Sequence, residues 1–194
     1  DDAITEEDES VVVKAETTDT QITNDSDTGT GIITDDRGTD NPGVDEDAKS
    51  TISVSDAGSV KEADDVYLTY QVKVDGAVGS NVVATISIDP SSTATAGDDF
   101  AEQLEYQNSE GNWQPVPANG QITLPGDTTA VSVRVKVLDD AITEDNESVV
   151  LKAETTDTQI TNGSDTGTGI ITDDRGTDNL GVDEDAQSTI SVSD

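Results

Sequence analysis

The stretch VSVRVKVLDD, residues 131–140, decides the fold class of this chain. Its valines fall on every second residue from 131 to 137 and alternate with polar side chains, which is the period of a half-buried β-strand. The same alternation occurs at residues 66–74 and 82–88. Shorter segments rich in Val, Ile and Thr follow at residues 51–55, 102–106, 121–124, 147–155 and 168–172. Seven or eight short strands separated by turn-rich segments predict an all-β, antiparallel β-sandwich.

An internal repeat organises the chain. Residues 139–194 match residues 1–56 at 50 of 56 positions, with an offset of 138. Near-identity over this length indicates a tandem array. We therefore divide the chain into residues 1–36, the closing strands of a preceding repeat, and 37–49, a linker. Residues 50–174 form a complete repeat, and residues 175–194 form a second linker with the first strand of the next repeat.

The composition restricts the function. The chain holds 43 acidic and 9 basic residues, a formal net charge of −34, and only 31% hydrophobic residues. Such a composition predicts disorder unless the charge is neutralised. Nucleic acids are excluded as partners because phosphate binding needs clustered Lys and Arg. No apolar run approaches the 18 residues of a spanning helix, so membrane insertion is not expected. An extracellular acidic protein without cysteine fits bacterial secretion better than a eukaryotic secretory route, so we expect a secreted protein of a bacterial cell surface.

Carboxylates follow the ends of several predicted strands. Residues 131–138 lead into Asp139 and Asp140, and residues 168–172 lead into Asp173 and Asp174. If consecutive strands run up and down, Glu62 and Asp89 reach the same pole of the sandwich, together with Asp64 and Asp65. Each like-charge pair at 4 Å costs about 4 kcal/mol at an effective dielectric near 20. Calcium resolves this repulsion, because it binds 6–8 oxygen ligands and needs neither His nor Cys.

Three segments resemble the Calx-β motif: STATAGDDF (92–100), VRVKVLDDAITEDNESVVLKAE (133–154) and GTGIITDD (167–174). The resemblance implies a seven-stranded, immunoglobulin-like sandwich that binds Ca²⁺. It assigns as ligands Asp139, Asp140, Glu144, Asp173, Asp174 and Glu62, and leaves open whether Glu147 is a ligand or structural. The equivalent acids of the first copy are Asp1, Asp2, Glu6, Asp35 and Asp36. Ser91 stands where the family has an Asp, with Asp89 close by, so the number of ions stays open.

The linker and the first copy carry two further hypotheses. Calcium bound between the domain end at Asp35 and Asp36 and the linker acids Asp45 and Asp47 would stiffen the joint. Residues 1–36 and 139–174 also compete for one place in one sandwich. If residues 139–174 take it, Val11, Val13, Ile32 and Ile33 lack a partner, and exchange between copies would give a homo-oligomer.

Two functions remain open from the sequence. The tandem context resembles the extender region of repeats-in-toxin adhesins, which implies a calcium-stiffened structural spacer whose partners are neighbouring repeats. The alternative is a carbohydrate-binding module in which Trp113 stacks on a glycan, although a Trp that folds back to cover the sandwich edge is the favoured interpretation of this residue. An enzyme is not expected, because no nucleophile and base of the usual kind are present.

Overall fold

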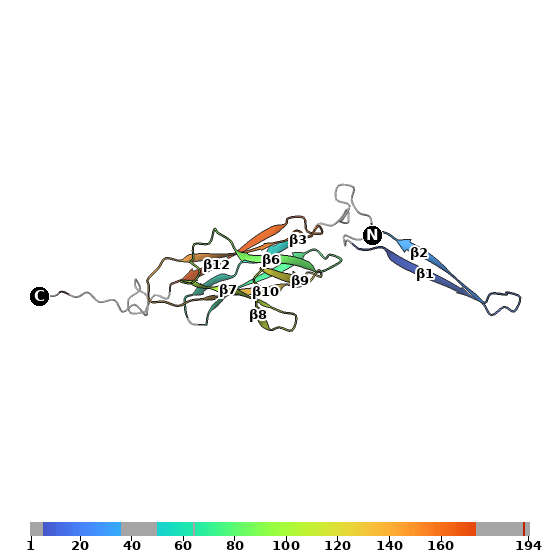
Figure 1. Ribbon diagram of the computed structural model, residues 1–194, viewed down its shortest axis with the longest axis horizontal. Helices are drawn as coiled ribbons and strands as arrows, with labels where there is room; N and C mark the ends of the chain where they lie inside the picture. Colours follow the sequence, from blue (N-terminus) through green and yellow to red (C-terminus); the bar gives the residue numbers. More distant parts are fainter. Residues whose placement is uncertain (1–5, 36–49, 64, 174–191, 193–194) are drawn as a thin grey trace.

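Ten strands form a two-layered sandwich in the computed structural model, which describes residues 6–35, 50–63, 65–173 and 192 (Figure 1). One sheet has the order β3-β5-β10-β7-β8 and the other β4-β12-β11-β6-β9. The first sheet comprises β3 (Thr51–Val54), β5 (Tyr67–Asp75), β10 (Val131–Val137), β7 (Phe100–Gln107) and β8 (Trp113–Pro115). The second comprises β4 (Gly58–Lys61), β12 (Ser164–Thr172), β11 (Glu147–Glu154), β6 (Val82–Ile88) and β9 (Gln121–Leu124).

The strand order is immunoglobulin-like. In that fold, strands A, B, E and D form one sheet and strands G, F and C the other. The order β3-β5-β10-β7 reproduces the first sheet and β12-β11-β6 the second. The chain adds β8 and β9 between the fourth and fifth strands of this scheme. The predicted all-β, immunoglobulin-like sandwich is confirmed.

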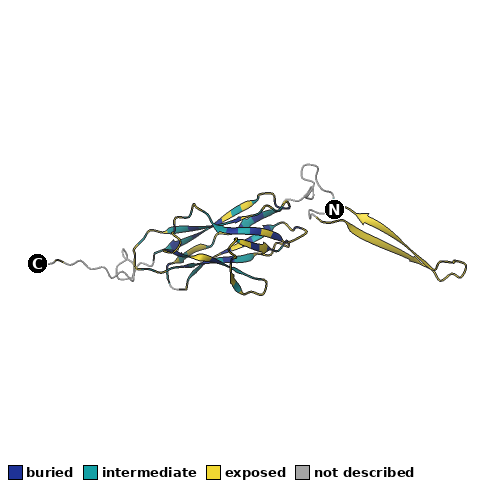
Figure 2. Cartoon of the chain, viewed as in Figure 1, coloured by how far each residue is buried: buried dark blue, intermediate teal, exposed yellow. Residues whose placement is uncertain are grey.

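The alternating side chains form the core between the two sheets. Val133, Val135 and Val137 of β10 are fully buried, and the burial of β5 and β11 alternates in the same way (Figure 2). The buried hydroxyl of Tyr70 in β5 donates to the backbone oxygen of Val149 in β11 at 2.8 Å, which joins the two sheets. A buried Tyr hydroxyl needs such a partner, because leaving it unpaired costs about 1–3 kcal/mol.

The sequence predicted a purely antiparallel sandwich, and the structure differs from this prediction at one pair of strands. The chain leaves β3, which is antiparallel to β5, and crosses to the other sheet, where β4 pairs parallel with β12 at Gly169↔Gly58 to Thr172↔Lys61. Two residues of the crossing are tied down, since Ser55 N donates to Gln71 O at 2.9 Å and Ala57 N to Thr168 O at 3.0 Å. β4 runs in the same direction as β3. Because β12 also runs in this direction, β4 and β12 pair parallel. The alternation of side chains carried no signal for this four-residue strand or for β8.

A separate hairpin precedes the sandwich. β1 (Glu9–Glu16) and β2 (Ser26–Ile33) pair only with each other among the described strands, and all of their residues are exposed (Figure 2). The linker at residues 37–49 lies outside the described residues, as does the proposed second linker with most of the segment that follows it. No helix in the described part of the chain is long and apolar enough to cross a membrane.

Arg134 is held between two aromatic rings on the outer face of β10. Its guanidinium carbon lies 3.9 Å from the ring centroid of Tyr67 and 4.0 Å from that of Trp113. Its Nε and Nη2 both donate to Oε2 of Glu105 at 2.7 Å. Trp113 thus packs on a neighbouring side chain of its own sheet, which favours the edge-covering interpretation of this residue.

Replacing Arg134 with Ala is expected to lower the free energy of unfolding by about 1–2 kcal/mol. Each cation–π contact contributes about 0.5–1 kcal/mol, and a partly exposed ion pair contributes about 0.2–1 kcal/mol. Urea denaturation measures the change. Lys136→Ala is the matched control, because its Nζ contacts only an exposed Asp65 at 3.3 Å and its loss should be nearly neutral. Equal losses in both variants would contradict the role of the aromatic pair.

Candidate metal centre

Five strand ends meet at one pole of the sandwich: the last residues of β4, β10 and β12 and the first residues of β7 and β11. Glu62 follows β4, Asp99 precedes β7, and Asp173 follows β12. The loop at residues 138–146 joins β10 to β11 at the same pole, and Glu147 begins β11. We call the seven carboxylates collected there the acidic pole: Glu62, Asp99, Asp139, Asp140, Glu144, Glu147 and Asp173.

Backbone hydrogen bonds fix the segments that carry these acids. Glu62 N donates to Thr172 O at 2.8 Å, which holds the segment after β4 against the end of β12. Leu138 N donates to Asp99 O at 2.9 Å, which holds the end of β10 against the start of β7. The acidic pole is therefore built on paired strand ends.

Two of the carboxylates also accept hydrogen bonds from the loop at residues 138–146. Asp140 N donates to Oε1 of Glu62 at 3.2 Å, and Glu144 N donates to Oδ1 of Asp173 at 3.1 Å. Within the loop, Ile142 N donates to Oδ1 of Asp140 at 2.7 Å. The loop is thus folded around acids that follow two other strands, and three of its own acids, Asp139, Asp140 and Glu144, belong to the acidic pole.

The tightest group consists of Asp99, Glu144 and Glu147. Each offers a carboxylate oxygen, and these oxygens lie within 4.8 Å of one another. Asp99 is 6% exposed, and its Oδ2 accepts a hydrogen bond from Thr95 N at 2.5 Å. Oxygens that share a calcium ion each lie about 2.3–2.6 Å from it, so separations below about 5 Å suit one common ion.

The electrostatics of the acidic pole disfavour its fully charged form. Burial, first, and the charges of Asp140, Glu144 and Asp139 together raise the pKa of Glu62 from its ordinary 4.5 to about 7. Burial also raises the pKa of Glu147 to about 7, together with a hydrogen bond to Asp99 and the charges of Asp99 and Glu144. Without a cation, the folded state therefore retains protons at these acids near neutral pH.

Glu144 interacts both with Asp99 of the tightest group and with Asp140 and Asp173 of the rest of the acidic pole. Burial raises its pKa, and the charges of Asp99, Asp140 and Asp173 raise it in turn. Every charge that raises these three pKa values is another carboxylate of the same pole. Glu62 itself is 3% exposed, and burying an unpaired carboxylate is unfavourable. The donor set consists of oxygen alone and therefore fits a hard cation such as Ca²⁺.

The structure brings together most of the acids that the sequence assigned to this pole. Glu62, Asp139, Asp140, Glu144 and Asp173 belong to it. Asp65 forms an ion pair with Lys136 instead. Several predicted ligands lie outside the described residues: Asp1, Asp2, Asp36, Asp45, Asp47 and Asp174. Glu6 and Asp35 are described, but no group of three acids that could hold a metal includes either of them among the described residues.

Asp89 lies apart from the acidic pole. Its backbone N donates to Val150 O at 2.8 Å, so it sits beside the fourth residue of β11 rather than at the start of that strand. Its Oδ1 accepts from Ser91 N at 2.9 Å and from Ser91 Oγ at 2.7 Å. These hydrogen bonds lower the pKa of Asp89, and so does the charge of Lys152. Ser91 thus binds the carboxylate of Asp89 locally.

Asp99 is the acid that the ligand assignment from the sequence missed. It belongs to the segment STATAGDDF, which carried part of the resemblance, but it precedes its strand. The strand argument placed the acids before residues 66–74 and after residues 82–88, 131–138 and 168–172 at this pole, and it did not include the acids before the strand at residues 102–106. Glu147, whose role the resemblance left open, also begins a strand and lies in the tightest group.

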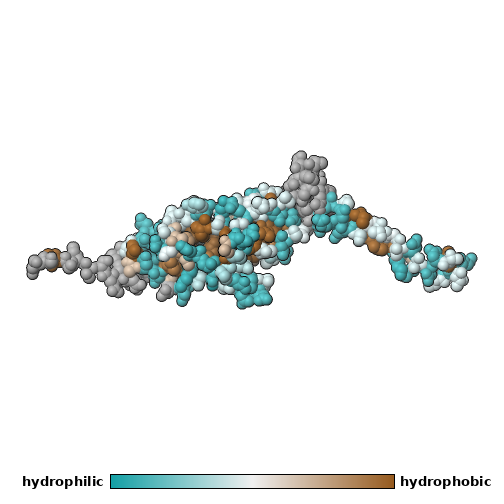
Figure 3. All heavy atoms as spheres, viewed as in Figure 1, coloured by the Kyte–Doolittle hydropathy of each residue, from teal (hydrophilic) through white to brown (hydrophobic). Residues whose placement is uncertain are grey.

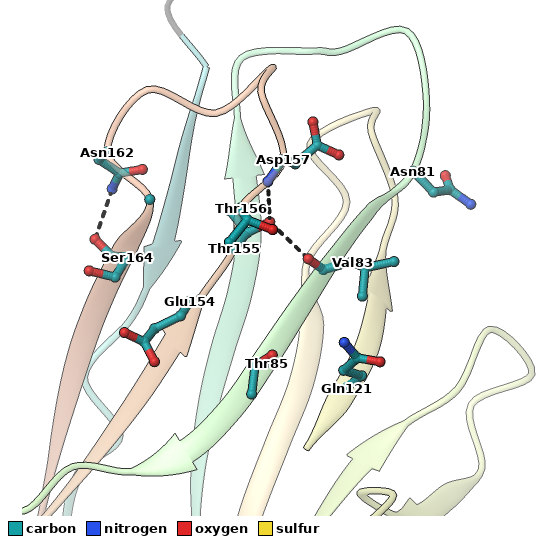
Figure 4. Close-up of a pocket in the computed structure, with 11 residues that line it drawn as sticks. Asn81, Val83, Thr85, Gln121, Glu154, Thr155, Thr156, Asp157, Asn162 and Ser164 are labelled. Carbon is teal, nitrogen blue, oxygen red and sulfur yellow. Dashed lines mark hydrogen bonds between the residues drawn. The ribbon is translucent and has the colours of Figure 1, made fainter. Parts of the chain in front are cut away.

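A hollow lies away from the acidic pole, where the other end of β11 meets β6 and β9 (Figure 4). Its volume is about 680 Å³, and it is lined by polar side chains such as Asn81, Gln121 and Glu154. Thr155 Oγ1 donates to Val83 O at 2.8 Å and accepts from Asp157 N at 3.1 Å (Figure 4). No aromatic side chain is among the residues that line this hollow. It therefore lacks the stacking platform typical of a sugar site.

No protein-family model matches the sequence, and no curated protein matches it. Among solved structures, the chain is similar to CBD12 from CALX1.2, with 16% identity over 66% of this chain and 46% of that chain (TM-score 0.43). It is also similar to the apo-form Calx CBD1 domain, with 17% identity over 63% of this chain and 99% of that chain (TM-score 0.43). The chain spans less than half of the CBD12 structure. The fold assignment above rests on the strand order of the chain itself.

Proposed function

We propose that this chain is a calcium-binding structural module. The observation that carries the proposal is the convergence of seven carboxylates at one pole, with Glu62 and Asp99 almost fully buried. Repulsion among these acids opposes folding, and a bound divalent cation would turn it into attraction. The residues that would hold the ion are Asp99, Glu144 and Glu147, with Glu62, Asp140 and Asp173 beside them. Calcium suits this oxygen-only set, because it accepts 6–8 carboxylate, carbonyl and water ligands.

The biological role that we propose is that of a spacer. The sandwich is one unit of a tandem array, as the repeat of residues 1–56 at 139–194 indicates. Such a unit would extend a large, calcium-dependent adhesin at a bacterial cell surface. The near-identity of the copies supports a shared mechanical role, since copies that each recognise a different ligand would differ in their loops. The charge of −34 keeps such a chain soluble and extended between its calcium sites.

Solution scattering on a chain with two complete repeats tests this role. Calcium is expected to increase the maximum dimension and narrow the distribution of distances, because ions at the domain end and the linker acids stiffen the joint. Asp45→Asn/Asp47→Asn in the linker is expected to remove the effect while each sandwich keeps its fold. A maximum dimension that is the same with and without calcium would contradict the spacer.

A further inference from the structure

Two hairpins of nearly the same sequence lie in different environments. β1 and β2 pair from Glu9↔Ile33 to Glu16↔Ser26, and β11 and β12 pair from Glu147↔Ile171 to Glu154↔Ser164. An offset of 138 converts one register into the other at every pair. The first hairpin therefore already has the internal geometry that the second has inside the sandwich.

The apolar face of the first hairpin has no partner among the described residues. Val149 and Leu151 of β11 are fully buried, while their counterparts Val11 and Val13 are 48% and 66% exposed. Ile33 of β2 is likewise exposed, although its counterpart in β12 belongs to the core. Figure 3 shows hydrophobic residues, in brown, at the surface of the hairpin. Burying a Val or Ile side chain stabilises by about 1.5–3 kcal/mol, so this face has a strong tendency to dock.

Both edges of the first hairpin are also open within the described chain. In the sandwich, β11 pairs with β6 on its outer side and β12 pairs with β4. β1 and β2 form a two-stranded sheet without such neighbours. Edges with unpaired backbone groups attract further strands. A partner that fits this hairpin must supply an apolar face between two strands, one to pair with each edge.

Two glycines of the hairpin indicate what that partner is. A Cβ built on Gly167 of β12 would lie 2.1 Å from Ser55 O, and one on Gly169 would lie 2.7 Å from both Leu68 Cδ2 and Tyr70 Oη. Glycine is needed there because the opposite sheet approaches closely. At the equivalent Gly29 and Gly31 of β2, a Cβ would meet nothing within 4 Å. The first hairpin thus has glycines at the two positions where a closely packed opposite sheet would leave no room for a Cβ, although it contacts no such sheet in this structure.

We propose that the β1–β2 hairpin docks into the sandwich of a second copy of this repeat, in the place that β11–β12 takes here. The surface it fits is the one formed by β4, β5 and β6. The same place in its own chain is filled by β11–β12, which follows β10 through the short loop at residues 138–146. The partner is therefore a copy whose closing hairpin is absent or displaced. In the tandem array of the proposed function, that copy is the preceding repeat, to which residues 1–36 were assigned as the closing strands.

Mixing full-length variants tests the docking. The acceptor carries Gly29→Val, Gly31→Val, Gly167→Val and Gly169→Val, so that neither of its hairpins fits and its sandwich stays open. The donor is the unmodified chain, and the control donor carries only Gly29→Val and Gly31→Val. Light scattering after size exclusion is expected to show a complex of twice 20.2 kDa with the donor and none with the control. Donor and control that behave alike would overturn the proposal.

A second variant covers the case in which the open acceptor does not fold by itself. The chain with only Gly167→Val and Gly169→Val keeps a competent first hairpin. It is expected to fold, by circular dichroism, and to assemble into dimers or longer chains whose mass rises with concentration. An unfolded chain would overturn the docking, and a folded monomer would show that the hairpin fills its own sandwich. Running both experiments with calcium and with chelator separates this proposal from calcium binding.

Discussion

Removal of calcium is expected to lower the Tm of the chain by about 10–20 °C. An ion that binds only the folded state at a thousandfold excess over its Kd contributes about 4 kcal/mol, and this corresponds to such a shift in a domain of this size. Asp99→Asn and Glu144→Gln are expected to remove most of the difference between calcium and chelator, because both residues belong to the tightest carboxylate group. Thermal unfolding followed by circular dichroism measures it.

Asp89→Asn is the matched control for this experiment. Asp89 is also an acid between strands, but its carboxylate is bound by Ser91 and lies apart from the acidic pole. We expect this variant to keep the full response to calcium. A Tm that does not change on addition of chelator would contradict the proposal that the chain binds calcium. A response lost in Asp89→Asn but kept in Asp99→Asn would mean that the site lies elsewhere.

The metal-free chain is expected to become more stable as the pH falls from 8 to 5.5. The folded state holds protons on Glu62 and Glu147 with pKa values of about 7, whereas the unfolded chain binds them only near the ordinary value of 4.5. Uptake of protons therefore favours the folded state. The gain begins as the pH falls through about 7 and is complete near 4.5. With saturating calcium the dependence reverses, because protons compete with the ion for the same oxygens.

Glu62→Gln/Glu147→Gln isolates this effect from the general charge of the chain. The double variant keeps the shape of both side chains but cannot titrate, so the Tm of its metal-free form should change much less between pH 8 and 5.5. Thermal unfolding in buffers of equal ionic strength measures the difference. A metal-free Tm that falls with decreasing pH in the unmodified chain would show that these acids are charged in the folded state.

Most of the acidic pole could be predicted from the sequence. The alternation at residues 131–137 is a local property that any half-buried strand imposes, and its end marks where the chain emerges from the core. Acids that directly follow such a strand lie at the pole toward which the strand runs. This holds for Asp139 and Asp140 after β10 and for Asp173 after β12. The up-and-down order of the strands placed Glu62 there, and the resemblance to the Calx-β motif added Glu144, which no strand periodicity indicates.

The sequence by itself determined most of the strands, the sandwich and the repeat, because side-chain alternation and self-similarity are properties of the chain alone. Only the tertiary structure decided which acids meet. The ladder between β6 and β11 holds Asp89 beside Val150 and away from the pole, while the pairing of β7 with β10 brings Asp99 toward it. It also decided that one of two nearly identical hairpins is buried and the other exposed. One sandwich offers one place for a closing hairpin, and the segment that directly follows β10 fills it.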